Sequence, residues 1–170
     1  NTGGLVLLAR NEAARAALAA MLADGRIRKR YRAILRGRPH PAAAVCSASL
    51  TKDAGRARVR VFDQPVPGSK PIRTGYRVLC AQEDLCLVEL ELMTGRTHQL
   101  RAHMAHLGHP VLGDEKYGDW ALNKRYGLRR QALWAVELEF APSPEFPRWD
   151  GLVLRSNAPF AICSNLDQHF

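Results

Sequence analysis

The chain has 170 residues, of which 46% are hydrophobic. It is therefore long enough to bury one core, and no apolar run reaches the roughly 20 residues of a membrane span. Its 25 lysines and arginines outnumber 16 aspartates and glutamates, giving a net charge of +9 with histidine neutral. This excess favours a polyanionic partner, most often nucleic acid, and a merely solvated basic surface is the alternative. No charged-then-apolar leader opens the chain, so we expect a cytoplasmic protein.

The amino-terminal part of the chain predicts a strand, a helix and a second strand. Residues 5–9 (LVLLA) form an apolar run typical of a buried strand. The alanine-rich stretch 11–23 predicts a helix, because Asn11 is a suitable N-cap and Gly25 follows the last alanine. Over residues 26–36, arginines alternate with apolar side chains, and this period of two indicates a strand with one basic face.

The rest of the chain predicts more strands than helices. Prolines mark residues 37–43 as a loop, and alternating arginines predict a second basic strand over residues 56–61. Beyond Phe140 we expect irregular structure. Further periodic segments predict strands at residues 74–80, 85–93 and 131–140 and a helix at residues 97–107. The class is α+β, with a mixed, largely antiparallel β-sheet and flanking helices in one domain, 1–170.

The four cysteines are scattered along the chain, at Cys46, Cys80, Cys86 and Cys163. They lack the paired spacing of a zinc site and the density of a disulfide scaffold. We therefore expect them to be reduced.

Several segments resemble, in chain order, the motifs of RluA-type RNA pseudouridine synthases. The longest is TGRTHQLRAH at residues 94–103, which continues through LGHP, Gly113-Asp114 and Tyr117-Gly118. KRYRA at residues 29–33 resembles the tyrosine motif of the family, and NTGGL at residues 1–5 resembles the end of its nucleophile motif. Lys70-Pro71 and Thr74 also fit the family pattern. The resemblance implies the pseudouridine synthase catalytic-domain fold and isomerisation of uridine to pseudouridine in structured RNA, ribosomal or transfer, without cofactor or metal.

The resemblance also implies an aspartate nucleophile. In the family motif this aspartate lies three residues before the threonine that matches Thr2, and therefore two residues upstream of Asn1. We expect a catalytic domain that is incomplete at its amino terminus, and 170 residues that bind RNA without converting uridine. The alternative is an RNA-binding pseudoenzyme or RNA chaperone, and the codons before Asn1 decide between the two. Gly3 stands where the family usually has serine.

Tyr31 and Arg101 are the expected catalytic residues. By the resemblance, Tyr31 lies against the target base and is a candidate acceptor of the C5 proton. An aromatic residue that shares a strand face with Ile27 and Leu35 is otherwise ordinary core. Arg101 matches the basic partner of the aspartate, because a guanidinium can hold a carboxylate bidentately and keep it ionised. The alternative for Arg101 is a solvated position on an amphipathic helix.

Other motif residues are expected to contact the substrate. Core packing is the alternative for the apolar one among them, Leu100. The expected substrate-binding residues are Lys29, Arg96, His98, Gln99 and Leu100.

Two further groups in these motifs have a weaker claim to function. Four histidines, His98, His103, His106 and His109, raise a metal hypothesis, but their spacing places no cysteine or carboxylate as a third ligand, and we predict no metal. Asp114 is a tempting nucleophile, but by the resemblance it is a turn element, and we interpret it as structural.

The basic residues outside the motifs are expected to face the phosphate backbone of the RNA. A solvated surface is the alternative for each residue taken alone. They are the arginines of the two basic strands together with Lys116, Lys124, Arg125, Arg129 and Arg130.

Overall fold

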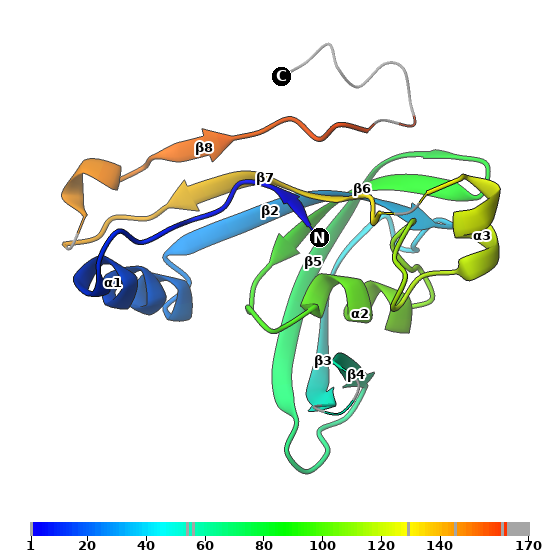
Figure 1. The fold of residues 1–170 in the computed structure, drawn as a ribbon, viewed down its shortest axis with the longest axis horizontal. Helices are drawn as coiled ribbons and strands as arrows, with labels where there is room; N and C mark the ends of the chain where they lie inside the picture. Colours follow the sequence, from blue (N-terminus) through cyan, green and yellow to red (C-terminus); the bar gives the residue numbers. More distant parts are fainter. Residues whose placement is uncertain are drawn as a thin grey trace.

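The computed structural model describes residues 2–162 apart from 54, 56, 129, 145 and 161. One sheet of eight strands forms its centre, in the order β1-β7-β2-β6-β5-β3-β4, with β8 paired to β7 (Figure 1). Strand β1 runs parallel to β7, and the other pairs are antiparallel. The expected α+β class is therefore correct. The strands are β1 (Gly3–Gly4), β2 (Ile27–Arg36), β3 (Ala43–Asp53), β4 (Arg58–Phe62), β5 (Lys70–Gln82), β6 (Leu85–Leu92), β7 (Leu133–Phe140) and β8 (Val153–Arg155).

The helices α1 (Glu12–Ala23) and α2 (Gln99–His106) lie on the same face of the sheet (Figure 1). Asn11 caps α1 as expected, because its side chain accepts a hydrogen bond from the backbone of Ala14 at 2.8 Å. A six-residue helix, α3 (Trp120–Arg125), and a short 3₁₀ helix (Pro147–Trp149) complete the fold.

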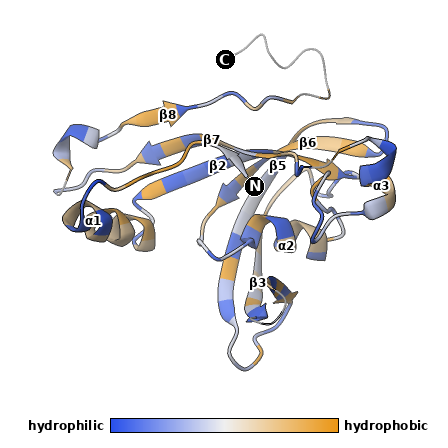
Figure 2. Ribbon diagram, in the orientation of Figure 1, coloured by the Kyte–Doolittle hydropathy of each residue, from blue (hydrophilic) through white to orange (hydrophobic). Residues whose placement is uncertain are grey.

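Alternation along the strands separates the two faces of the sheet, and Figure 2 shows it as apolar and polar residues that take turns along β2 and β7. On the helix side, Leu35 and Leu90 of the sheet pack with Leu100 and Met104 of α2, and all four are buried. This apolar layer holds the amino-terminal end of α2 against the middle of β2.

The expected strand at residues 5–9 is wrong. Strand β1 comprises Gly3 and Gly4 alone, and the chain then continues outside the sheet. Val6 is 72% exposed and Leu8 is 85% exposed. Leu5 and Leu7, in contrast, pack against the core under α1, so this extended segment is apolar all round but buries only one side.

Gly3 lies directly over the ring of Trp134 in β7. A Cβ added at Gly3 would come within 2.2 Å of that ring. The serine that the family usually carries here would therefore require Trp134 to move, and the glycine allows the two strands to pair closely.

Four elements were not expected from the sequence: β3, α3, the 3₁₀ helix and β8. Strand β3 consists largely of alanine, serine and other small residues, and it is ordered because β4 and β5 pair with it on both sides. Strand β8 pairs with β7 over three residues, so the segment after Phe140 is not wholly irregular. The second basic strand exists as β4, and the expected first arginine of that strand, Arg56, lies outside the described residues.

The structure also bears on the expectations for the cysteines and for membrane-spanning segments. Cys46 and Cys86 are free, but Cys80 is disulfide-bonded, so the expectation of reduced cysteines is wrong for Cys80, and Cys163 lies outside the described residues. Within the described part of the chain, no helix is both long and apolar enough to cross a membrane.

Candidate active site

A hollow of about 200 Å³ opens where the start of α2 meets β2 and β7. It gathers residues that are far apart in the sequence. Its lining comprises Thr2, Tyr31, Leu92, Arg96, His98, Gln99, Leu100, Arg101 and Leu133. Six of the seven residues expected from the sequence therefore lie together. The seventh, Lys29, is on the same face of β2 as Tyr31. Its ammonium lies beside Gly95, 3.5 Å from the position that a Cβ would take there.

Tyr31 supplies an aromatic wall of this hollow. The side chain is half-buried at the centre of β2, and burial raises the pKa of its hydroxyl. At neutral pH the ring is therefore a protonated phenol, suited to stacking and hydrogen bonding rather than to acting as a strong base. Burial also lowers the pKa of the neighbouring Lys29 ammonium.

Arg101 is held by Asp114, and this pair was not expected. Arg101 Nε donates to Asp114 Oδ2 at 2.6 Å and its Nη2 donates to Oδ1 at 2.7 Å. The Arg101 side chain is 11% exposed and that of Asp114 is fully buried. Burial alone would raise the pKa of Asp114. The hydrogen bonds from Arg101 and from the backbone of Tyr117 and Lys116 outweigh burial, and the pKa is lowered.

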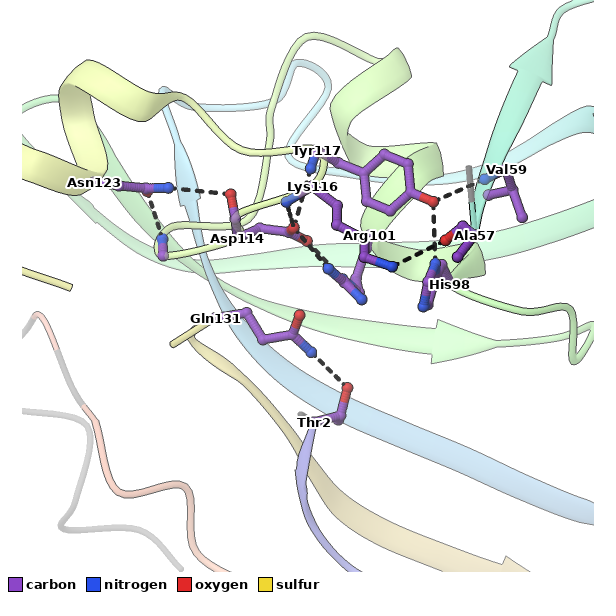
Figure 3. A network of polar contacts seen from close by, with 11 residues as sticks. Thr2, Ala57, Val59, His98, Arg101, Asp114, Lys116, Tyr117, Asn123 and Gln131 are labelled. Carbon is purple, nitrogen blue, oxygen red and sulfur yellow. Dashed lines mark hydrogen bonds and ion pairs between the residues drawn. The ribbon is translucent and has the colours of Figure 1, made fainter. Parts of the chain in front are cut away.

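Asp114 is also a turn residue, as the sequence indicated. Its Oδ1 accepts hydrogen bonds from the backbone nitrogens of Lys116 at 2.8 Å and Tyr117 at 3.0 Å. The interpretation as a purely structural turn is nevertheless incomplete, because the same carboxylate fixes the guanidinium of Arg101 at the hollow (Figure 3). Sequence spacing alone could not reveal this pairing across thirteen residues.

His98 and Tyr117 form a second contact beside this pair (Figure 3). His98 adopts a left-handed conformation with φ of 52° immediately before α2, and its Nδ1 lies 3.1 Å from the Tyr117 hydroxyl. That hydroxyl also accepts a hydrogen bond from the backbone of Val59 at 2.9 Å. Burial, followed by the charge of Arg101, lowers the pKa of His98, so its imidazole is neutral at pH 7. Tyr117 belongs to one of the sequence motifs, but the motif alone gives it no role.

Gln99 lines the hollow and also has a structural role that the sequence did not indicate. The side chain is buried, and its carbonyl oxygen accepts hydrogen bonds from Thr94 Oγ1 at 2.9 Å and from the backbone of Arg96 at 3.1 Å. Its amide nitrogen donates to the Arg73 carbonyl at 2.9 Å and to Thr74 Oγ1 at 3.2 Å. Gln99 thereby fastens the turn that carries Arg96 and His98 onto β5.

A second, more polar hollow of about 270 Å³ adjoins the first. The two share His98 and Arg101. The other residues lining the polar hollow are Gly113, Glu115, Lys116, Arg130 and Gln131. Three cations face one carboxylate here, so the polar hollow favours an anion such as a phosphate. Gln131 donates a hydrogen bond to Thr2 Oγ1 at 2.7 Å, which places the amino-terminal strand at the border of both hollows (Figure 3).

The histidines considered as metal ligands have separate partners. His103 Nδ1 lies 3.0 Å from Thr74 Oγ1, His106 Nε2 lies 2.7 Å from an Asp63 oxygen, and His109 Nδ1 lies 3.0 Å from a backbone carbonyl oxygen. Across the described residues, no three His, Cys, Asp or Glu side chains are grouped so that they could hold a metal ion.

The arginines of β2 do not line the hollow. Because successive side chains of a strand alternate, Arg28 and Arg30 lie on the face opposite Tyr31. Arg30 forms an ion pair with Glu137, and its Nη2 lies 3.5 Å from Glu139. These two side chains are therefore outside the hollow, and their expected contact with the RNA backbone stays a prediction.

The arginines of β4 differ from each other. By alternation, Arg58 and Arg60 both point away from the side on which Val59 packs under α2. Arg58 is the first residue of the strand, however, and its guanidinium carbon lies 6.0 Å from the centre of the Tyr117 ring. Arg58 thus reaches towards the candidate site. Arg129, another expected RNA contact, lies outside the described residues.

The fold and this pair of hollows define an α+β domain whose site combines an aromatic wall with fixed cations. A family model described as RNA pseudouridylate synthase matches residues 1–106. The chain therefore belongs to the RNA pseudouridylate synthase family, which confirms the resemblance found in its motifs.

Similar proteins agree with this assignment. A protein of Chloroflexus aurantiacus, described as an uncharacterized RNA pseudouridine synthase, is 39% identical over 88% of this chain and 45% of its own length. Ribosomal large subunit pseudouridine synthase D of Zymomonas mobilis is 37% identical over 82% of this chain and 45% of its length. The chain thus spans about half the length of these curated relatives. The solved structure of human RNA pseudouridylate synthase domain containing 4 matches with a TM-score of 0.68 and 25% identity, over 88% of this chain and 64% of the human one.

Proposed function

We propose that the whole protein isomerises specific uridines to pseudouridine in structured RNA, and that the uracil enters the hollow beside Tyr31. The observation that supports this most strongly is the convergence of Tyr31, Leu100 and Arg101 on one hollow of about 200 Å³. We further propose that the reaction takes place in the cytoplasm and needs neither metal nor cofactor.

In this proposal, each part of the site acts on a different part of the substrate. The neutral ring of Tyr31 and the apolar side chain of Leu100 hold the faces of a flipped base, a contact that alanine substitution typically values at about 1–3 kcal/mol per base. The adjoining polar hollow, with Lys116 and Arg130, binds phosphate oxygens. The neutral His98 and the Tyr117 hydroxyl position the start of α2.

The nucleophile in this proposal is an aspartate that precedes Thr2. The described residues that line the hollow include no carboxylate, and Asp114 is fully buried against Arg101. Thr2 itself lines the hollow, and three residues of extended chain span at most roughly 10 Å. An aspartate at that distance can reach Arg101, whose Nε and Nη2 are taken by Asp114 but whose Nη1 remains for a second carboxylate.

The substrate RNA is ribosomal or transfer RNA in this proposal, and the name of the Zymomonas mobilis relative favours large-subunit ribosomal RNA. Pseudouridine mapping tests both the reaction and the RNA. RNA from cells lacking the gene should miss at least one pseudouridine, and the whole gene should restore it. Genes carrying Arg101→Ala, or asparagine in place of the upstream aspartate, should not.

Two results would contradict this proposal. An unchanged pseudouridine map after loss of the gene, combined with RNA binding by the whole protein, would favour the RNA-binding pseudoenzyme. Conversion of uridine by the 170 residues alone would place the nucleophile within this chain.

A further inference from the structure

Trp120, at the start of α3, is an indole that does not contribute to the core. Its side chain is 75% exposed, whereas Leu122 and Tyr126 of the same segment pack against a core cluster. A large aromatic residue that is exposed to water on a helix is typical of a binding surface, because stacking on a ligand buries the apolar area that folding leaves exposed.

Helix α3 is fixed to the loop that carries the candidate site. Asp119 caps the helix by accepting a hydrogen bond from the backbone of Leu122 at 3.0 Å. Asn123 accepts a hydrogen bond from the backbone of Gly113 at 2.6 Å and donates one to the Asp114 carbonyl at 3.1 Å (Figure 3). The loop that holds Arg101 through the Asp114 carboxylate thus also sets the position of Trp120.

Trp120 borders a hollow of about 240 Å³, separate from the two described above. Its lining comprises Asp114, Glu115, Gly118, Trp120, Asn123, Lys124 and Leu128. Glu115 also lines the polar hollow beside Arg101, so the two hollows are neighbours. The Lys124 ammonium lies 5.3 Å from the centre of the Trp120 ring. An indole and an apolar Leu128 beside a cation suit a nucleobase and its phosphate better than they suit a protein strand.

We propose that Trp120, Lys124 and Leu128 form a shelf, the Trp120 shelf, on which an unpaired RNA base adjacent to the flipped uridine stacks. This inference rests on the proposed function, because it requires RNA in the catalytic hollow. Flipping a uridine removes a stacking partner from its neighbours, and an aromatic platform next to the pocket replaces that partner. Glu115 in the same lining favours a base over a phosphate inside the shelf, which leaves Lys124 at the rim for the phosphate.

The test is a double-mutant cycle between protein and RNA. The whole protein and its Trp120→Leu variant are titrated with the single-stranded heptanucleotide AAAUAAA, and with versions in which one adenosine at a time is abasic. The single uridine sets the register. Trp120→Leu should weaken binding of the intact heptanucleotide roughly five- to 150-fold. At one of the tested positions, the abasic substitution should weaken binding by the unaltered protein to a similar degree. With that heptanucleotide, Trp120→Leu should cause no further loss of affinity.

Trp120→Phe is the matched variant, because it keeps an aromatic ring at an exposed position where folding does not depend on the indole. It should retain most of the affinity that Trp120→Leu loses. The shelf alone would be overturned if Trp120→Leu bound the heptanucleotide as tightly as the unaltered protein does. It would also be overturned if Trp120→Phe bound no more tightly than Trp120→Leu. Failure of the unaltered protein to bind the heptanucleotide would also overturn the shelf, whereas the pseudouridine map of cells lacking the gene tests the RNA assignment separately. A shelf that serves a protein partner would give the first of these results.

Discussion

Arg101 and Asp114 form a bidentate ion pair, with two contacts of 2.6 and 2.7 Å between residues that a helix and a loop bring together. The carboxylate is fully buried and the guanidinium is nearly so. Breaking such a pair by removing one charge typically costs about 3–5 kcal/mol, because the other charge is left in a poorly solvated place. The pair therefore couples the stability of the domain to the orientation of Arg101 at the hollow.

We predict that Asp114→Asn destabilises the domain by about 3–5 kcal/mol, measured as the free energy of unfolding in denaturant. The amide keeps an oxygen for the backbone of Lys116 and Tyr117 but no longer balances the charge of Arg101. In the whole protein, turnover should also fall by roughly 100-fold, since Arg101 loses its fixed orientation.

Asp63→Asn is the control for this prediction. Asp63 also forms an ion pair, with His106, but its side chain is 85% exposed, so its loss should cost less than about 1 kcal/mol. Equal stability of the two variants would contradict the importance of the buried pair.

His103 makes folding stability depend on pH. The side chain is 1% exposed, and burial, aided by the charge of His106, lowers its pKa from 6.5 to about 4. Below pH 6.5 the unfolded chain binds a proton at this position and the folded chain does not until about pH 4. Stability should therefore be greatest above pH 6.5 and fall by about 3 kcal/mol as the pH drops to about 4.

The measurement is the free energy of unfolding at several pH values in that range. His103→Gln removes the titration and should flatten the curve between pH 6.5 and 4, even if it lowers stability throughout. His40→Gln, at an exposed histidine, should leave the slope in place. An equally steep curve for His103→Gln would show that other groups cause the pH dependence.

Gln99 is predicted to act by positioning the turn before α2. Gln99→Ala removes four hydrogen bonds and leaves the buried Thr74 hydroxyl with His103 as its remaining side-chain partner, at a cost of about 1–3 kcal/mol. Hydrogen exchange at the Arg96 amide, which Gln99 protects, should become faster in the variant. Gln82→Ala, at an exposed position at the end of β5, is the control and should leave that amide protected.

Part of this site could be predicted from the sequence, because its motifs are contiguous. The segment around Arg96 and Arg101 forms one turn and one helix, so residues close in sequence reach the same hollow. The Arg101–Asp114 pair could not be predicted, because only the fold turns the loop after α2 back onto the helix. Strand β3 could not be predicted for a different reason. Its small residues give no clear alternation, and pairing with β4 and β5 determines its structure.

Alternation of arginines was also ambiguous, because a period of two defines a face without showing what that face meets. On β2, Arg30 pairs with Glu137 and Glu139 of β7, whereas the side chain of Arg28 remains 60% exposed. The basic row that resembled an RNA-binding surface is thus, in part, a set of cross-strand ion pairs.

Arg58 and Arg60 provide a matched test of which arginines touch RNA. They are two residues apart on β4 and both are exposed, but Arg58 alone of the two lies against the Tyr117 ring beside the candidate site. Each phosphate contact that is lost should reduce the slope of log binding constant against log salt concentration by roughly 0.7 for a single strand. Arg58→Ala should therefore weaken RNA binding and flatten this slope by about that amount, whereas Arg60→Ala should leave the slope close to that of the unaltered protein. Filter-binding or anisotropy titrations of the 170-residue chain at several salt concentrations measure both values. Equal slopes for the two variants, whether flattened or unchanged, would mean that the position of Arg58 beside Tyr117 does not bring it to the phosphate backbone.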